Sequence, residues 1–121
     1  MKIRIYYEDT DAGGVVYHTK YIAFCERARS EVFFQNGVTF DEDGFVVRDI
    51  QATFLKPAKL GDLIEVKTKI DLIKRSFVNI TQKIYKDENL FFEAKIKLVF
   101  LKNWKIATIP SSYKKILERL K

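Results

Sequence analysis

Apolar and charged residues alternate along several stretches of this chain, and the alternation predicts strands. Between residues 63 and 73 an apolar side chain stands at nearly every second position, with Lys, Glu or Asp between them. A period of two is typical of a strand with one buried and one solvated face. On this pattern and on β-favouring composition we expect strands at 2–7, 45–55, 63–73, 77–85, 90–101 and 104–109.

One early segment has a helical period instead. From His18 to Asn36 the apolar residues recur every three or four positions, and this spacing predicts an amphipathic helix. We expect its buried stripe to consist of Tyr21, Phe24, Cys25, Ala28 and Val32. Asn36 and Gly37 supply the helix end, and the spacing of apolar residues over 113–120 predicts a short terminal helix.

The order of these elements predicts an α+β fold. One strand, one long helix and then four or five sequential antiparallel strands give a sheet with one face for the helix to cover, so we expect the sheet to wrap the early helix. A chain of 121 residues has the size of one domain, and we assign residues 1–121 to it. The N-terminus of the helix would then lie next to the loop at 8–18.

The charge and the aromatic content of the chain indicate which classes of binding partner are favoured. Lys and Arg outnumber Asp and Glu by 22 to 16, a net charge of +6, which favours an anionic partner. The basic residues are scattered and accompany no helix-turn-helix, zinc-ligand or aromatic RNA-binding pattern, so a small phosphorylated ligand is favoured over nucleic acid. Ten Phe and six Tyr in so short a chain predict self-association through aromatic surface.

The cellular location is predicted from what the sequence lacks. Its single cysteine, Cys25, has no partner for an internal disulfide, and the first residues do not resemble a signal peptide. No apolar run reaches the roughly 20 residues that a membrane-spanning helix needs. We therefore expect a cytoplasmic protein without integral membrane association. A lone histidine without cysteine partners also makes a poor metal site, so no metal is expected.

The most informative stretch is the polar loop that runs into the helix. It holds a Gly13-Gly14 pair and the only histidine, His18, after three carboxylates, which are Glu8, Asp9 and Asp11. An acid, a histidine and a helix N-terminus can surround one reacting group, which suggests an active site. The same residues also fit a plainer interpretation, in which acidic turn residues precede the helix and His18 helps to cap it. The residues alone favour neither.

Across this loop and the helix start, the sequence resembles the hotdog-fold thioesterases of the 4-hydroxybenzoyl-CoA thioesterase family, specifically the YbgC-like acyl-CoA thioesterases. The resemblance is carried by Tyr7-Glu-Asp-Thr-Asp-Ala-Gly-Gly-Val-Val-Tyr-His18 and by the segments 24–29, 45–48 and 57–62. It implies a hotdog fold, in which a five- to six-stranded antiparallel sheet wraps a long central helix. It also implies an enzyme that hydrolyses acyl-CoA, short-chain by expectation, to free acid and CoA, with no cofactor besides the CoA of the substrate.

The resemblance assigns the catalytic carboxylate to Asp11, with His18 as a second functional residue. Asp11 would attack the thioester or deprotonate a water, and the sequence leaves both routes open. The N–H groups at the helix start would stabilise the oxyanion, and Gly14 would let the backbone approach closely. Tyr17 would line the pocket or simply pack. Cys25, on the apolar stripe, is interpreted as a small buried hydrophobe rather than a nucleophile.

Coenzyme A carries phosphates, so the resemblance also requires basic residues at the mouth of the site. Lys74, Arg75 and Ser76 occupy a predicted turn and are the first candidates, with an ordinary exposed turn as the alternative. Lys56 and Lys59 are weaker candidates. Enzymes of this type are dimers or dimers of dimers, so we expect a homo-oligomer, in the larger case a homotetramer, with residues of two chains in each site.

Other functions stay open at this point. A binding module for acyl-carrier protein or anionic lipid would use the same basic surface without turnover. A hotdog dehydratase would also need a carboxylate and a histidine, although the surroundings of Asp11 match thioesterases better. Acyl-carrier protein is likewise an alternative donor of the acyl group.

Overall fold

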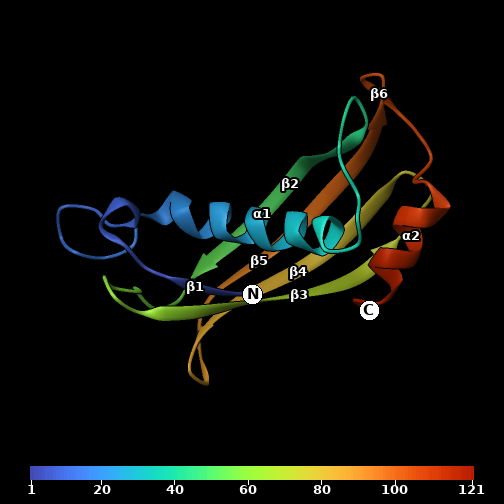
Figure 1. The fold of residues 1–121 in the computed structure, drawn as a ribbon. Coiled ribbons are helices and arrows are strands. Elements are labelled where there is room, and N and C mark those ends of the chain that lie inside the picture. The colour runs from blue at the N-terminus through green and yellow to red at the C-terminus, as the bar shows by residue number, and fades with distance from the viewer.

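A six-stranded antiparallel sheet and a long helix make up most of the fold, which a computed structural model describes for residues 1–121 (Figure 1). The elements in chain order are β1 (Lys2–Arg4), the 3-10 helix η1 (Tyr7–Asp9), α1 (His18–Phe34), β2 (Gly44–Phe54), β3 (Leu63–Ile73), β4 (Phe77–Lys86), β5 (Asn89–Lys102), β6 (Lys105–Ile106) and α2 (Ser111–Glu118). This arrangement confirms the predicted α+β architecture. The strand predicted at 63–73 has the expected bounds, because its alternating pattern continues over its whole length.

The core lies between α1 and the central strands. The strands follow the order β1-β3-β4-β5-β2, with β6 paired to β5, and α1 lies against one face of the sheet (Figure 1). On β4 every second side chain is buried on the helix side, namely Val78, Ile80, Gln82 and Ile84. β5 adds the buried side chains of Phe92, Ala94, Ile96, Leu98 and Phe100. The sheet therefore covers the early helix, as predicted.

α1 buries the predicted stripe. Tyr21, Phe24, Cys25 and Ala28 are buried, and Val32 packs against the edge of the core. The helix ends at Phe34, two residues before the predicted end. Gly37 reverses the chain there with a φ of 77°, a value that favours glycine, and its N–H donates to the carbonyl oxygen of Phe34 at 3.0 Å.

The first strand is shorter than predicted. It stops at Arg4, and Tyr7, the last residue of the predicted strand, begins η1 instead. The reason is local, because Asp9 Oδ2 accepts the backbone N–H of Tyr6 at 2.9 Å and closes a turn at this point. This turn directs the chain away from the sheet and into the loop that precedes α1.

The last strand is also shorter than predicted. Only Lys105–Ile106 pairs with β5, because Asn103 and Trp104 both have positive φ and form a tight turn. The chain then leaves the sheet, and the N–H of Ile109 donates to the carbonyl oxygen of Arg75 at 2.8 Å. The terminal helix starts and ends two residues before its predicted bounds.

β2 lies at the edge of the sheet and leaves part of its inner side uncovered. Its pairing places Phe45 opposite Phe100 and Phe54 opposite Phe92, so these side chains share the helix side of the sheet. The inner side chains of β2 are therefore Phe45, Val47, Ile50, Ala52 and Phe54. Val47 is nevertheless 45% exposed and Phe54 is 48% exposed. Such an apolar edge is a surface that a ligand or a second chain can cover.

Candidate active site

A buried carboxylate, Asp9, holds the acidic loop together. The residue is 4% exposed, and its Oδ2 accepts the N–H of Tyr6. Its carbonyl oxygen accepts the N–H of Tyr17 at 2.9 Å, and Lys20 Nζ lies 3.8 Å from Oδ1. Asp9 thus connects the beginning of the loop to the start of α1, and both of its carboxylate oxygens already interact with groups of the chain.

Asp11 is exposed and keeps one carboxylate oxygen free. Its Oδ1 accepts the N–H of Gly13 at 2.8 Å, its N–H donates to the carbonyl oxygen of Val15 at 2.9 Å, and its carbonyl oxygen accepts the N–H of Gly14 at 3.1 Å. Gly14 has a φ of 79°, which this turn requires. Oδ2 has no hydrogen-bond partner in the chain. The loop therefore orients the carboxylate through one oxygen and leaves the other available for chemistry.

A second loop, residues 57–62, supports the first. The N–H of Val16 donates to the carbonyl oxygen of Ala58 at 2.8 Å, and Val15 pairs with Lys59 in an isolated bridge. The N–H of Ala58 in turn donates to the hydroxyl oxygen of Tyr21 at 2.9 Å. Burial, partly offset by this hydrogen bond, raises the pKa of Tyr21, so its hydroxyl stays neutral. Tyr21 therefore couples α1 to the loop that backs the Asp11 segment.

The start of α1 presents two free backbone donors. His18 and Thr19 are its first residues, and their N–H groups donate to no group of the chain, whereas the N–H of Lys20 donates to the carbonyl oxygen of Tyr17 at 2.9 Å. No side chain caps this end. Because the helix dipole adds partial positive charge here, these two N–H groups form a ready site for an oxyanion.

The His18 side chain is exposed and lies among aromatic rings. Its ring centroid is 4.5 Å from that of Tyr17 and 6.3 Å from that of Phe54. Phe54 also contacts Tyr21, with 5.8 Å between ring centroids. The predicted residues Asp11, Gly14, Tyr17 and His18 thus belong to one continuous loop and helix start, and Phe54 of β2 forms the neighbouring wall.

Within one chain, the predicted basic turn lies far from His18 and the start of α1. Lys74, Arg75 and Ser76 connect β3 to β4, at the end of β3 that lies near α2 (Figure 1). β3 runs roughly 35 Å between the two ends. Arg75 Nε donates to Thr108 Oγ1 at 2.9 Å, so its side chain helps to hold the segment that leads into α2.

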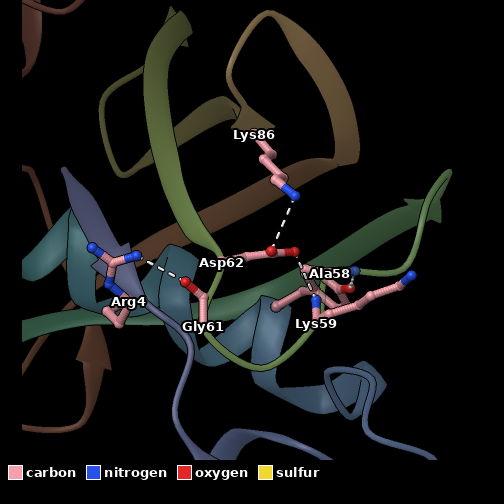
Figure 2. Close-up of polar contacts among 7 residues, drawn as sticks. Arg4, Ala58, Lys59, Gly61, Asp62 and Lys86 are labelled. Atoms are coloured by element: carbon pink, nitrogen blue, oxygen red, sulfur yellow. Dashed lines mark hydrogen bonds and ion pairs between the residues drawn. The ribbon is translucent and has the colours of Figure 1, made fainter.

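Another basic cluster lies beside the second loop. Figure 2 shows the Asp62 carboxylate between the Lys86 ammonium, at 3.0 Å, and the backbone N–H of Lys59, at 2.9 Å. Burial alone would raise the pKa of Asp62, but the hydrogen bonds from Lys59 and Lys86 outweigh it and the pKa is lowered. Arg4 Nη1 donates to the carbonyl oxygen of Gly61 at 2.8 Å. The Lys59 ammonium belongs to no ion pair of the chain.

Cys25 is a core residue, as predicted. It is fully buried, and its burial raises the pKa of the thiol to about 12, an effect that the nearby Arg29 only partly offsets. A thiol with such a pKa is protonated at neutral pH and is a poor nucleophile.

Sequence reasoning did not identify Phe54 as part of the site framework. Phe54 reaches His18 from the far end of β2, and no local pattern signals this approach. The Thr19 donor, by contrast, is one of the N–H groups expected at the helix start.

The structure contains no group of three or more His, Cys, Asp and Glu side chains arranged to hold a metal ion. None of its helices combines the length and the apolar character needed to span a membrane.

A family model and several characterised or solved proteins match this chain. The model described as "Thioesterase superfamily" matches residues 13–91. The Acyl-CoA thioesterase YbgC of Helicobacter pylori (strain ATCC 700392 / 26695) is 41% identical over 133 residues, which cover 99% of this chain and 100% of the relative. The Acyl-CoA thioester hydrolase YbgC of Escherichia coli O6:H1 is 43% identical over 103 residues, covering 80% of this chain and 77% of the relative.

Solved structures match over nearly the whole fold. A probable thioesterase from Bartonella henselae superimposes with a TM-score of 0.81 at 33% identity, covering 91% of this chain and 96% of the other. A hypothetical protein from Aquifex aeolicus gives a TM-score of 0.91 at 24% identity, covering 97% of each chain.

Proposed function

The chain belongs to the thioesterase superfamily, and from this premise we propose that it hydrolyses the thioester of acyl-CoA to free acid and coenzyme A. The family match confirms the resemblance to the YbgC-like thioesterases and, with the solved structures, the hotdog fold. The observation that carries the proposal is that one loop and the helix start after it hold both a carboxylate with one free oxygen and two unpaired N–H groups.

Asp11 supplies the attacking chemistry. In one route its Oδ2 bonds to the thioester carbonyl carbon, the C–S bond breaks, the thiolate takes up a proton, and water then hydrolyses the mixed anhydride and restores Asp11. In the other route Asp11 takes a proton from a water whose oxygen bonds to the carbonyl carbon, and the thiolate leaves with a proton. Labelled oxygen in the Asp11 carboxylate after a single turnover in labelled water would establish the anhydride route, because only water attack on the Asp11 side of the anhydride can place it there.

The start of α1 supplies the oxyanion site. The N–H groups of His18 and Thr19 would donate to the carbonyl oxygen as it gains negative charge, and such donors contribute several kcal/mol of transition-state stabilisation. The His18 ring, exposed beside Tyr17 and Phe54, would direct the water or protonate the thiolate. We expect His18→Ala to lower turnover strongly and leave the protein folded.

For the phosphates of coenzyme A the chain offers two basic sets. Lys59 belongs to the loop 57–62, which contacts Val15 and Val16, and its ammonium is in no ion pair of the chain. It is therefore our first candidate for the nucleotide end of the substrate. Lys74, Arg75 and Ser76 remain candidates that a neighbouring subunit would have to supply, since within one chain they lie at the far end of β3.

We also propose a dimer formed along β2. The strand pairs on one side only, its inner residues Val47 and Phe54 are half-exposed, and the wall beside His18 belongs to it. A second copy paired along this edge would complete the surroundings of the site. A dimer of dimers, the homotetramer expected from the sequence, would need a further contact on another face.

The test is the release of free thiol from a panel of acyl-CoAs, with short straight chains first. The fully buried Cys25 will not contribute to the thiol signal of the native protein. We expect release with a clear dependence on chain length, and the same panel on acyl-carrier protein identifies the preferred donor. No release from any acyl-CoA, together with tight binding of acyl-carrier protein, would contradict the proposal and favour a binding module.

A further inference from the structure

Aromatic contacts join α1 to β2 at two places, and the first of these places lies at the candidate active site. His18 and Phe54 lie at one end, and Phe33 and Phe45 lie at the other, with 5.7 Å between the centroids of this second pair. α1 and β2 therefore run side by side in opposite directions (Figure 1). Between these two places lies the apolar inner side of β2, of which Val47 and Phe54 are half-exposed within one chain.

A cavity lies between α1 and β2 at the end far from His18. This cavity has a volume of about 470 Å³, within the range of small-molecule sites. Its apolar lining consists of Phe33, Phe40, Phe45, Val47 and Leu98. The helix contributes polar groups to the same cavity, from Glu26, Arg29 and Ser30.

Arg29 is the unusual member of this lining. It is half-buried, and its Nη1 donates to the Oε1 of Gln82 at 2.9 Å, which is the only hydrogen bond of its guanidinium within the chain. It takes part in none of the three ion pairs of the structure. Burial lowers the pKa of the guanidinium, an effect that Cys25 and Glu26 only partly offset, and Glu26 does not approach to ion-pair distance. A half-buried cation with unused donors can bind an anionic partner.

Gln82 keeps this guanidinium in place. It is fully buried, and its Nε2 donates to the carbonyl oxygen of Cys25 at 2.9 Å and to Thr68 Oγ1 at 3.0 Å. These two bonds orient the amide, so Oε1 points toward Arg29. The arginine head is therefore fixed by the sheet beneath it.

Arg29 also shares a face of α1 with His18. They are eleven positions apart, so their side chains leave the helix in directions that differ by about 20° and lie about 16 Å apart along its axis. Ile22, between them, lies on the same side. An acyl chain that starts at a thioester beside His18 and follows the inner side of β2 alongside α1 would place its far end near Arg29.

We infer that the acyl chain of the substrate lies along the inner side of β2 beside α1 and that Arg29, which lines the cavity at its far end, is a specificity residue that binds a carboxylate at the distal end of that chain. The inference rests on the proposed thioesterase function and names its substrate class, the monothioesters of dicarboxylic acids. The spacing of about 16 Å between His18 and Arg29 along α1 also favours acyl groups longer than the short chains expected from the sequence. A carboxylate there would receive a charge-assisted and partly desolvated pair of hydrogen bonds from the guanidinium.

The test compares matched substrates on Arg29→Met and on Arg27→Met. Arg27 projects from the opposite side of α1, where its guanidinium lies 5.8 Å from the ring centroid of Phe24, so its variant controls for loss of charge. The substrate pairs have equal length and differ at the end group: suberyl-CoA with octanoyl-CoA, and sebacyl-CoA with decanoyl-CoA. We expect Arg29→Met to lower kcat/KM for the carboxylate-ended member by roughly 10- to 100-fold, mostly through KM. Octanoyl-CoA and decanoyl-CoA should be hydrolysed as well as before, and Arg27→Met should change neither series.

An unchanged ratio between the two series in Arg29→Met would overturn the inference, and so would an equal loss in both series accompanied by a change in subunit number. The second result would mean that a carboxylate of another copy pairs with Arg29. Turnover of neither series by the wild type would instead remove the proposed function and this inference with it. If Arg29→Met does not fold, product inhibition of the wild type decides, because sebacate should inhibit more strongly than decanoate, and the reverse order would contradict the inference.

Discussion

Replacing Tyr21 by Phe removes one atom that links α1 to the loop behind the active-site segment. Tyr21 is 4% exposed and Ala58 is fully buried, so the N–H of Ala58 has no access to water as a substitute acceptor. The phenyl ring would keep its stacking on Phe92, at 5.3 Å between centroids, so the change isolates the hydroxyl. A buried donor left unsatisfied costs about 1–3 kcal/mol, which is a large share of a typical stability of about 5–15 kcal/mol.

For a domain of this size we therefore expect Tyr21→Phe to lower the melting temperature by about 4–12 °C. Circular dichroism measures this change, and amide hydrogen exchange should show faster exchange at Ala58 in particular. Tyr113→Phe is the matched control, because the Tyr113 ring packs among aromatic residues and its hydroxyl has no partner in the chain. We expect this control to stay within about 0.5 kcal/mol of the wild type. A melting temperature of Tyr21→Phe within about 1 °C of the wild type, with unchanged exchange at Ala58, would refute the reasoning.

Three further predictions concern groups around the site. Because the pKa of Asp62 is lowered in the folded state, its carboxylate contributes to stability above about pH 4, and this contribution is lost as the pH falls through the folded-state pKa. The melting temperature of the wild type should therefore fall with pH in this range, and an equally steep fall in Asp62→Asn would contradict the prediction. Cys25→Ala should keep the rate of thioester hydrolysis within about twofold of the wild type, because the thiol, with a pKa of about 12, is protonated. A large loss of kcat in a folded variant would indicate a chemical role for the thiol. Lys59→Ala should raise the KM for acyl-CoA roughly two- to fivefold at low salt and leave kcat unchanged. A larger KM increase in Arg75→Ala would assign the phosphates to the other basic set.

The regular elements were predictable because their patterns are local. The alternation over 63–73 and the three- and four-residue spacing after His18 each specify one face of one element. The chain ends were less predictable, because their structure depends on single contacts. Asp9 closes a turn where the apolar pattern would continue a strand, and Trp104 adopts a positive φ that its residue type does not suggest.

The candidate site was predictable in its loop and unpredictable in its surroundings. Asp11 and His18 are close in sequence, so one motif names both. Phe54 lies beside the site and Gln82 holds Arg29 at the cavity, both from strands distant in the chain, and periodicity shows only that each faces inward. The placement of Lys74 away from His18 follows from the length of β3, which the sequence predicts, but also from the direction of α1 across the sheet, which it does not.

The central claim is that the Asp11 carboxylate carries out the hydrolysis, and the most direct test is the kcat of Asp11→Asn beside that of Glu8→Gln. The Asn side chain can still accept the N–H of Gly13 and preserve the loop, whereas it can neither attack the thioester nor take a proton from water. Glu8 is an exposed carboxylate of the same loop without a partner in the chain, so its variant controls for loss of charge. We predict a fall in kcat of about 10²–10⁴-fold for Asp11→Asn and no more than a twofold change for Glu8→Gln. Hydrolysis by Asp11→Asn at a rate close to that of the wild type would contradict the account.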